Sequence, residues 1–142
     1  MNLSAKTEYA CIAVLELAVQ HGSGRPVRIR EIARANGIPA RFLVQILLQL
    51  KGAGIVTSTR GSAGGYHLAR DPADLSLGEV MAIIEGQARG PATSMSNKTV
   101  ASRTLARVWR EVAASERQLL EATSFADLAA QVRGHADQMY YI

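Results

Sequence analysis

Apolar residues recur at three- and four-residue steps along most of this chain, and that spacing predicts amphipathic helices. We predict helices at residues 4–21, 30–36, 40–51, 77–85, 100–122 and 125–133. The segment 55–69 differs, because two short runs, IVTST and YHLA, flank the glycine-rich RGSAGG. This arrangement predicts an antiparallel hairpin with strands at 55–59 and 66–69. The expected fold is therefore mostly α-helical with one small β-hairpin.

The two helices at 30–36 and 40–51 are separated by a short turn that contains Gly37 and Pro39. Glycine ends a helix readily, and proline is tolerated in the first turn of the next one. The expected buried stripe of the second helix is formed by Leu43, Ile46, Leu47 and Leu50. Two short helices, a tight turn and a following hairpin predict a winged helix-turn-helix, whose second helix enters the major groove of DNA.

The other face of the helix at 40–51 carries residue types that recognise bases. It holds Arg41, Val44, Gln45 and Gln49. Arg41 and Gln45 lie one turn apart, so both can point the same way. Arginine pairs with guanine, and glutamine with adenine, through two hydrogen bonds each. Arg60, at the base of the hairpin tip, is placed for the minor groove. The alternative for the glycines of this tip is an ordinary hairpin.

The long helix at 100–122 has an apolar stripe that requires a partner. Its members are Leu105, Val108, Trp109, Val112 and Leu119. Two-fold dimerisation is the commonest way to cover such a stripe. The alternative is packing within the chain, on the first helix, and the two arrangements can use different faces. Earlier in the chain, Ser76 and Glu79 have the spacing of a capping box at the start of the helix at 77–85.

The charged residues are distributed unevenly along the chain. The chain has 16 Lys/Arg and 12 Asp/Glu, a net charge of +4. Residues 1–70 hold nine of the basic and three of the acidic residues, a net of +6, whereas 71–142 hold seven and nine. A basic half favours a polyanionic partner, because neutralising phosphates releases counterions. Lys6, Arg28 and Arg30 are candidate phosphate contacts, which fix register rather than sequence.

Other classes of protein are not favoured by this sequence. No apolar run is long enough to span a bilayer, and the first residues lack a signal-peptide pattern, so we expect a cytoplasmic protein. Cys11 is the single cysteine and lies on the apolar side of the first helix. We expect it to be structural, with a redox switch as the alternative, which would need a lowered pKa. His21, His67 and His135 are scattered, and no catalytic arrangement is recognisable, so an enzyme is not predicted.

Several stretches of the chain resemble one family of bacterial regulators. The matching stretches are LSAKTEYA at the start, IREIARANGIPARFLVQIL, and above all LKGAGIVTSTRGSAGGYHLAR. LSLGEVMAIIEG, the helix that bears Trp109, and FADLA follow in the order of the family. The chain is thereby identified as resembling the winged-helix transcription regulators typified by IscR, NsrR and CymR, over nearly its whole length.

The resemblance implies a homodimer that binds a palindromic operator, usually as a repressor. In the family, the recognition helix and the wing contact DNA, and the long helix pairs the subunits. By position these roles fall on Arg41, Phe42, Gln45 and Arg60, with Ser62 in the turn of the wing. The stripe that contains Trp109 would then lie between the subunits.

The chain departs from this family at its best-known cofactor site. Many members hold an iron–sulfur cluster by three cysteines in the loop before the long helix, but segment 86–99 has none. Such a cluster cannot form without thiolates, so we expect no cofactor and no metal. Glu8, which matches a ligand position of some relatives, is expected to be a surface or ion-pairing residue. Val44 replaces an acidic residue that discriminates between operators in certain members, so operator choice does not transfer.

The sequence therefore predicts a homodimeric transcription regulator, most simply a repressor. We expect a DNA-binding domain at 1–85, a loop at 86–99, and a dimerisation helix with a C-terminal helix at 100–142. Double-stranded DNA and a second copy of the chain are the expected partners, and a small molecule or protein is the expected class of effector. The alternatives are a winged-helix protein-interaction module, and a ligand or redox sensor in which DNA binding is secondary.

Overall fold

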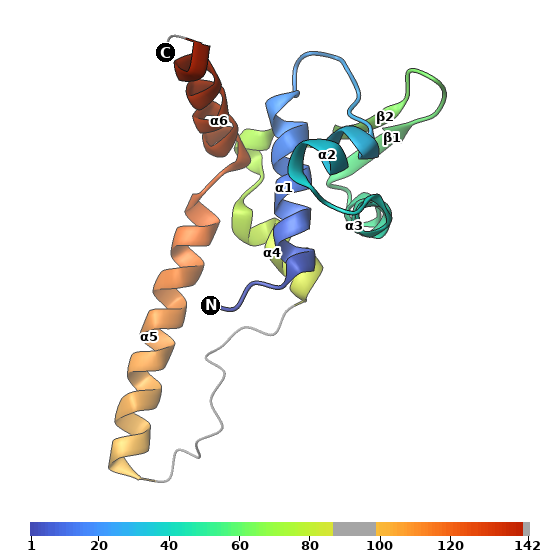
Figure 1. Cartoon of the computed structure of the whole chain (residues 1–142). Coiled ribbons are helices and arrows are strands. Elements are labelled where there is room, and N and C mark those ends of the chain that lie inside the picture. Colours follow the sequence, from blue (N-terminus) through green and yellow to red (C-terminus); the bar gives the residue numbers. More distant parts are fainter. Residues whose placement is uncertain (87–98, 141–142) are drawn as a thin grey trace.

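The computed structural model describes residues 1–86 and 99–140, the latter without the side chains of 138–140. Figure 1 shows α1 in the centre, with α2, α3 and the β-hairpin on one side and with α5 and α6 on the other. The elements are α1 (Ala5–Val19), α2 (Ile29–Asn36), α3 (Ala40–Gly52), β1 (Val56–Thr59), β2 (Gly65–Leu68), a 3-10 turn η1 (Pro72–Asp74), α4 (Leu77–Glu85), α5 (Val100–Ala122) and α6 (Phe125–Tyr140).

The first three helices form where the apolar periodicity places them. Ser4 is the N-cap of α1, and its Oγ accepts a hydrogen bond from the backbone N–H of Thr7. Gly37 ends α2 with a φ of 64°, a left-handed conformation that costs glycine little. This residue lets the chain turn tightly into α3. The predicted stripe of α3 is confirmed, since Leu43, Ile46, Leu47 and Leu50 are all buried in the core.

The hairpin is joined to the helical core by a third extended segment. Strand β1 pairs antiparallel with β2, with Val56 opposite Leu68 and Thr59 opposite Gly65. Val27, in the link before α2, forms an isolated bridge with Tyr66, with N–H to carbonyl distances of 2.9 and 2.7 Å. The wing is therefore hydrogen-bonded to the segment that enters α2, and this fixes the position of the hairpin relative to the helix-turn-helix.

Two backbone hydrogen bonds join the segment between α5 and α6 to the start of α4. The backbone N–H of Leu77 donates to the carbonyl of Thr123, and that of Phe125 donates to the carbonyl of Leu75. Phe125 is fully buried. Helix α6 packs on α1, whereas α5 packs on α4. The alternative of α5 packing on the first helix is therefore not what the structure has, because α6 occupies that side of α1. The first turns of α5 lie away from the other labelled helices (Figure 1).

Two sequence-based details are corrected by the structure. Helix α6 continues to Tyr140 rather than ending at Arg133, because Gly134 lies within the helix and no proline or cap stops it there. The capping box of α4 is half formed. Ser76 accepts from the N–H of Glu79, but the carboxylate of Glu79 pairs with Arg70.

Most of the expected loop at 86–99 lies outside the described residues. No helix in the described part of the chain is long and apolar enough to cross a membrane.

Candidate nucleic-acid interface

The outer face of α3 presents the predicted base-reading pair. Arg41 and Gln45 are both exposed, on the side opposite the buried leucines. No acidic residue occurs within α3 itself. Two donor-rich side chains, one turn apart on an exposed helix, are a suitable arrangement for contacts to base edges. The structure places both residues on the exposed face, as the sequence predicts, and their contact with DNA stays a prediction.

Arg41 is held in place by an aromatic stack at the start of α3. Its guanidinium carbon lies 5.0 Å from the ring centroid of Phe42, within the range of a cation–π interaction. Phe42 in turn stacks on Tyr9 of α1, with ring centroids 6.1 Å apart. The stack links α1 to the recognition helix and limits the rotamers open to Arg41. Lys6 lies one turn before Tyr9, and it is exposed in the first turn of α1.

The wing turn is too tight for any side chain at Gly64. A Cβ built there would lie 2.2 Å from the carbonyl oxygen of Thr59 and 2.9 Å from that of Gly61. Arg60 and Ser62 are both exposed in this turn. Within β1, close to this turn, the hydroxyl of Ser58 accepts a hydrogen bond from the ammonium of Lys51, at 2.6 Å. The predicted wing residues therefore lie at an exposed tip whose shape depends on glycine.

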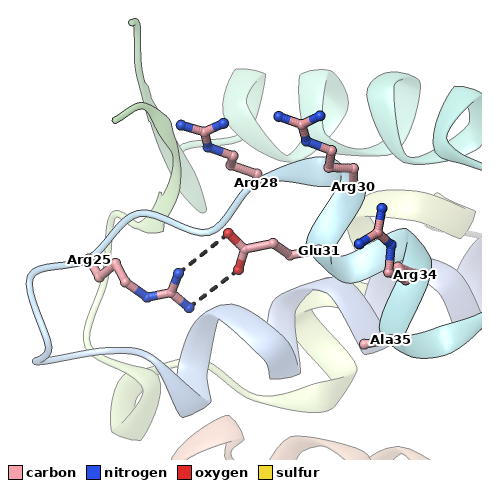
Figure 2. Close-up of a pocket in the computed structure, with 6 residues that line it drawn as sticks. All are labelled: Arg25, Arg28, Arg30, Glu31, Arg34 and Ala35. Atoms are coloured by element: carbon pink, nitrogen blue, oxygen red, sulfur yellow. Dashed lines mark hydrogen bonds and ion pairs between the residues drawn. The ribbon is translucent and has the colours of Figure 1, made fainter. Parts of the chain in front are cut away.

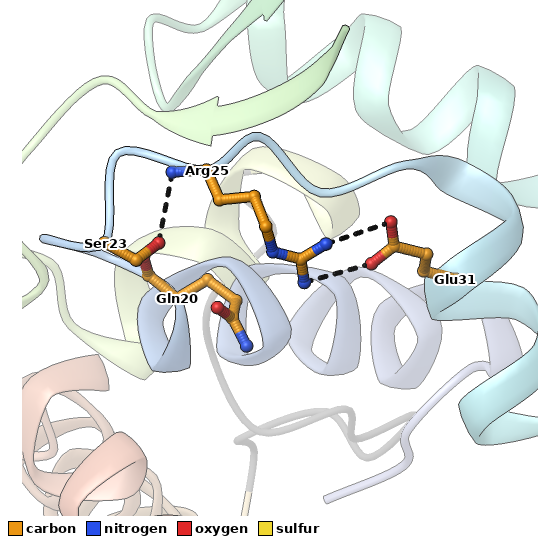
Figure 3. Close-up of polar contacts among 4 residues, drawn as sticks. All are labelled: Gln20, Ser23, Arg25 and Glu31. Carbon is orange, nitrogen blue, oxygen red and sulfur yellow. Dashed lines mark hydrogen bonds and ion pairs between the residues drawn. The ribbon is translucent and has the colours of Figure 1, made fainter. Parts of the chain in front are cut away.

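A concavity of about 630 Å³ lies at the start of α2, and most of its lining is basic. Figure 2 shows Arg28 and Arg30 pointing away from the Arg25–Glu31 pair, with Arg34 farther along α2. Arg25 forms an ion pair with Glu31, at 3.3 Å, and its backbone N–H donates to the hydroxyl of Ser23 (Figure 3). Four arginines and one carboxylate line the concavity, so it has an excess of positive charge, which suits a phosphate backbone.

Sequence reasoning identified two residues of this concavity and missed two. Arg28 and Arg30 were predicted as phosphate contacts, and both lie here. Arg25 and Arg34 were not predicted. Arg25 reaches the concavity because its ion pair with Glu31 holds it against α2, and Arg34 lies one turn after Arg30. The signal that could have found Arg34 is its spacing of four residues from Arg30, which places both on one face of a helix.

One predicted outer-face residue has a different role. Gln49 is half-buried, and its side-chain amide donates to the carbonyl oxygen of Ile83, at 3.0 Å. Ile83 lies near the end of α4, where helix carbonyls have no partner within the helix. Gln49 therefore joins α3 to α4 and is not part of the exposed face. Helical spacing alone could not show this, because the position of α4 is a tertiary feature.

Cys11 lies on the half-buried side of α1 that packs on the core. Burial, together with the negative charge of Glu85, raises the pKa of its thiol to about 11. That direction is opposite to the lowered pKa that a redox switch requires. Glu85 also accepts a hydrogen bond from the buried hydroxyl of Thr7, at 3.0 Å. The neighbourhood of Cys11 is thus a structural junction between α1 and α4.

The raised pKa of Cys11 predicts that its thiol reacts slowly. At pH 8 about 0.1% of the thiol would be ionised, and the thiolate is the reactive form. Alkylation by iodoacetamide should therefore be slow and should rise about tenfold for each pH unit between pH 7 and 9.5. The unfolded chain in urea, whose thiol has an ordinary pKa near 8.5, is the control and should level off near pH 9. A folded-state rate that levels off below pH 9 would contradict this assignment.

The predicted stripe of α5 is exposed along its whole length. Leu105, Val108, Trp109, Val112 and Leu119 are all accessible in the single chain, with Trp109 46% exposed. A neighbouring side of the helix contacts α4, where a Cβ on Gly78 would lie 3.2 Å from the Cβ of Leu120. The stripe and the contact with α4 therefore use different faces, and the apolar face has no partner within the described chain.

Metal-binding groups do not gather anywhere in residues 1–86 and 99–140. No group of three or more His, Cys, Asp or Glu side chains there could hold a metal ion. Glu8 is exposed in the first turn of α1. The chain has one cysteine, which lies on α1 with a raised pKa. The residues present do not fit a cluster held by several thiolates.

Comparison with known proteins places this geometry among transcriptional regulators. A family model described as Rrf2, iron-dependent transcriptional regulator, matches residues 3–131. A Mycobacterium tuberculosis protein with an HTH-type transcriptional regulator name is 39% identical over 142 aligned positions, which cover 91% of this chain and 81% of that protein. CymR, an HTH-type transcriptional regulator of Bacillus subtilis, is 32% identical over the full length of both chains.

Solved structures give the same result for the fold. The structure of B. subtilis CymR, titled the global cysteine regulator, matches with a TM-score of 0.82 at 30% identity, over 92% of this chain and 98% of that one. The structure of T. potens IscR matches with a TM-score of 0.76 at 31% identity, over 93% and 88%. The predicted fold class, mostly helical with a small hairpin wing, is confirmed.

Proposed function

We propose, from the premise that the chain belongs to the Rrf2 family of transcriptional regulators, that it acts as a homodimeric repressor on a two-fold symmetric operator. Membership in that family confirms the resemblance noted in the sequence, and it makes the chain a DNA-binding transcriptional regulator. Its relatives are regulators rather than enzymes. The homodimer, the symmetry of the operator and the direction of regulation belong to the proposal.

The exposed pair Arg41 and Gln45 on α3 is the observation that carries the proposal. In a helix-turn-helix the second helix lies in the major groove with its first residues against base edges. Arg41 is the second residue of α3, and its cation–π contact with Phe42 reduces the side-chain entropy lost on binding. In this proposal Arg41 and Gln45 read sequence, and Phe42 acts through its stack with Tyr9.

Residues assigned to the DNA backbone flank the exposed face of α3. The concavity at the start of α2 brings Arg28 and Arg30 together with Arg34, and these would neutralise phosphates without reading sequence. Lys6 extends the basic surface at the start of α1. Arg60 and Ser62, at the wing tip, are assigned to the adjacent minor groove, whose narrow form attracts arginine. Residues 1–85 would thus carry the contacts to DNA.

Dimerisation is assigned to segment 100–142. The exposed stripe on α5 supports this, because an apolar face that is unpartnered in one chain can be buried against the same face of a second copy. A dimer would place two α3 helices on one duplex. A two-fold axis in the protein then calls for a palindromic operator. The effector that releases the dimer is expected to be something other than a cluster held by cysteines.

The proposal is tested by fluorescence anisotropy with metal-free protein. The duplex upstream of the protein's own gene is compared with a scrambled duplex, at two salt concentrations. Tight binding that prefers the native duplex would support a regulator that needs no cluster to bind. Equal, weak and salt-sensitive binding to both would contradict sequence-specific reading by this form. The absence of binding to either duplex at low salt would favour a protein-interaction module instead.

Replacing Arg60 with alanine should weaken specific binding without changing the fold. A lost groove contact costs about 1–3 kcal/mol, or roughly five- to 150-fold in affinity. Anisotropy with the preferred duplex measures the loss, and circular dichroism checks the fold. Arg117→Ala removes the same charge from an exposed position on α5, so it serves as the matched control. Equal affinities for the two variants would remove Arg60 from the interface.

A further inference from the structure

The outer face of α3 is not uniformly polar. Positions 41, 45 and 48 recur at steps of four and three, so they lie along one side of the helix, and Val44 lies at its edge. Leu48 is 58% exposed and Val44 is 43% exposed. Leu48 is thus in line with Arg41 and Gln45, on the face that a helix-turn-helix turns toward DNA.

Basic residues surround the apolar pair Leu48 and Val44. Arg41 lies at one end of α3 and Lys51 at the other, and Arg60 extends from the neighbouring wing. The core needs neither side chain, since the opposite stripe of α3 already fills it. A partner that is polyanionic and also offers small apolar groups therefore fits this face. The major groove of DNA has both, because each thymine projects a methyl group into it.

We propose that Leu48, with Val44 beside it, contacts thymine methyl groups and so sets part of the operator sequence. This inference rests on the proposed function and deepens it. Arg41 and Gln45 select bases by hydrogen bonds, whereas Leu48 selects by burying a methyl group that cytosine and the purines lack at that point. The operator would then have a thymine in each half-site, next to the bases that Gln45 and Arg41 read.

Selection of duplexes from a random pool by the full-length chain is the first step of the test. Sequencing the bound fraction gives the preferred half-site. We expect enrichment of thymine at one or more positions per half-site, and we expect the Leu48→Ala variant to lose that preference while it keeps the others. If the wild-type chain enriches no sequence at all, the proposed function fails, and this inference fails with it.

Deoxyuridine substitution is the second step, because uracil differs from thymine only by the methyl group. At each contacted position, replacing thymine should weaken wild-type binding about fourfold, and about fifteenfold when both half-sites are changed, which is the effect of burying one carbon group per site. Leu48→Ala should bind the two duplexes equally well. Leu48→Met, which keeps a long apolar side chain, should restore the difference.

Two results would overturn the assignment while leaving the proposed function intact. One is a selected operator whose thymines can all be replaced by uracil without loss of wild-type affinity. The other is a Leu48→Ala variant that binds DNA as the wild type does but changes its state of association in sedimentation. That second result would make the apolar part of α3 an interface between copies of the chain.

Discussion

Replacing Trp109 with glutamate should convert the proposed dimer into monomers. Trp109 lies in the middle of the exposed stripe of α5, with Leu105 and Val112 one turn to either side. Tryptophan at the centre of an interface commonly contributes about 2 kcal/mol or more, and a buried carboxylate adds a desolvation cost. Each dimer would carry the change twice, so its affinity should fall by at least about a thousandfold. Sedimentation velocity at micromolar concentration measures the result.

A matched control for this change is Gln118→Glu. Gln118 is also exposed on α5 but lies on the other side of the helix from Trp109, so the same side chain is introduced away from the stripe. This control should remain dimeric. A Trp109→Glu variant that also sediments as a dimer would move the interface away from the stripe. Loss of the dimer should also weaken binding to a palindrome far more than binding to a single half-site.

The way in which α5 is held leaves this stripe exposed in the single chain. Helix α5 is fixed at its C-terminal end by the buried side chain of Phe125 and by the close approach of Gly78 to Leu120. Its N-terminal end is closed by Thr99 and Ser102, which form a reciprocal capping box. A helix that is capped at one end and packed against the core at the other can extend beyond the core without fraying.

Much of the fold was predictable because burial on a helix leaves a periodic trace. The stripe of α3 was predicted residue by residue, since Leu43 and Leu50 and the residues between them can be buried together only in a helix. Helix α4 was predicted to its exact bounds because Ser76 marks its start and Gly86 follows its end. The hairpin was predicted because glycines separate two short strands.

What the sequence could not provide depends on contacts between distant segments. The bridge from Val27 to Tyr66 and the hydrogen bond from Gln49 to Ile83 each join residues more than thirty positions apart. Neither has a local pattern to predict it. The arginine concavity is similar, because Arg25 approaches α2 only through the bend after α1 and its pair with Glu31. Local periodicity predicts elements, whereas these side-chain partners follow from how the elements pack.

Replacing Gly64 with alanine should abolish the contribution of the wing to DNA binding while leaving the helices intact. A Cβ at this position would lie 2.2 Å from a backbone carbonyl oxygen, a distance that no side-chain rotamer can relieve. The backbone from Thr59 onward would therefore have to move, which would displace Arg60 and Ser62 together. The loss of affinity should equal or exceed that of Arg60→Ala, which means at least about fivefold for a groove contact.

Anisotropy with the preferred duplex measures this loss, and far-ultraviolet circular dichroism shows whether the helices persist. Gly134→Ala is the control, because Gly134 lies in α6, where an added Cβ meets no atom within 4 Å. Alanine there should stabilise the helix by about 1 kcal/mol and leave DNA binding unchanged. The wing would be excluded from the interface if Gly64→Ala bound the duplex as tightly as Gly134→Ala. The DNA contacts would then be confined to α3 and the basic surface around α2, with the hairpin serving only to hold Val27 in place.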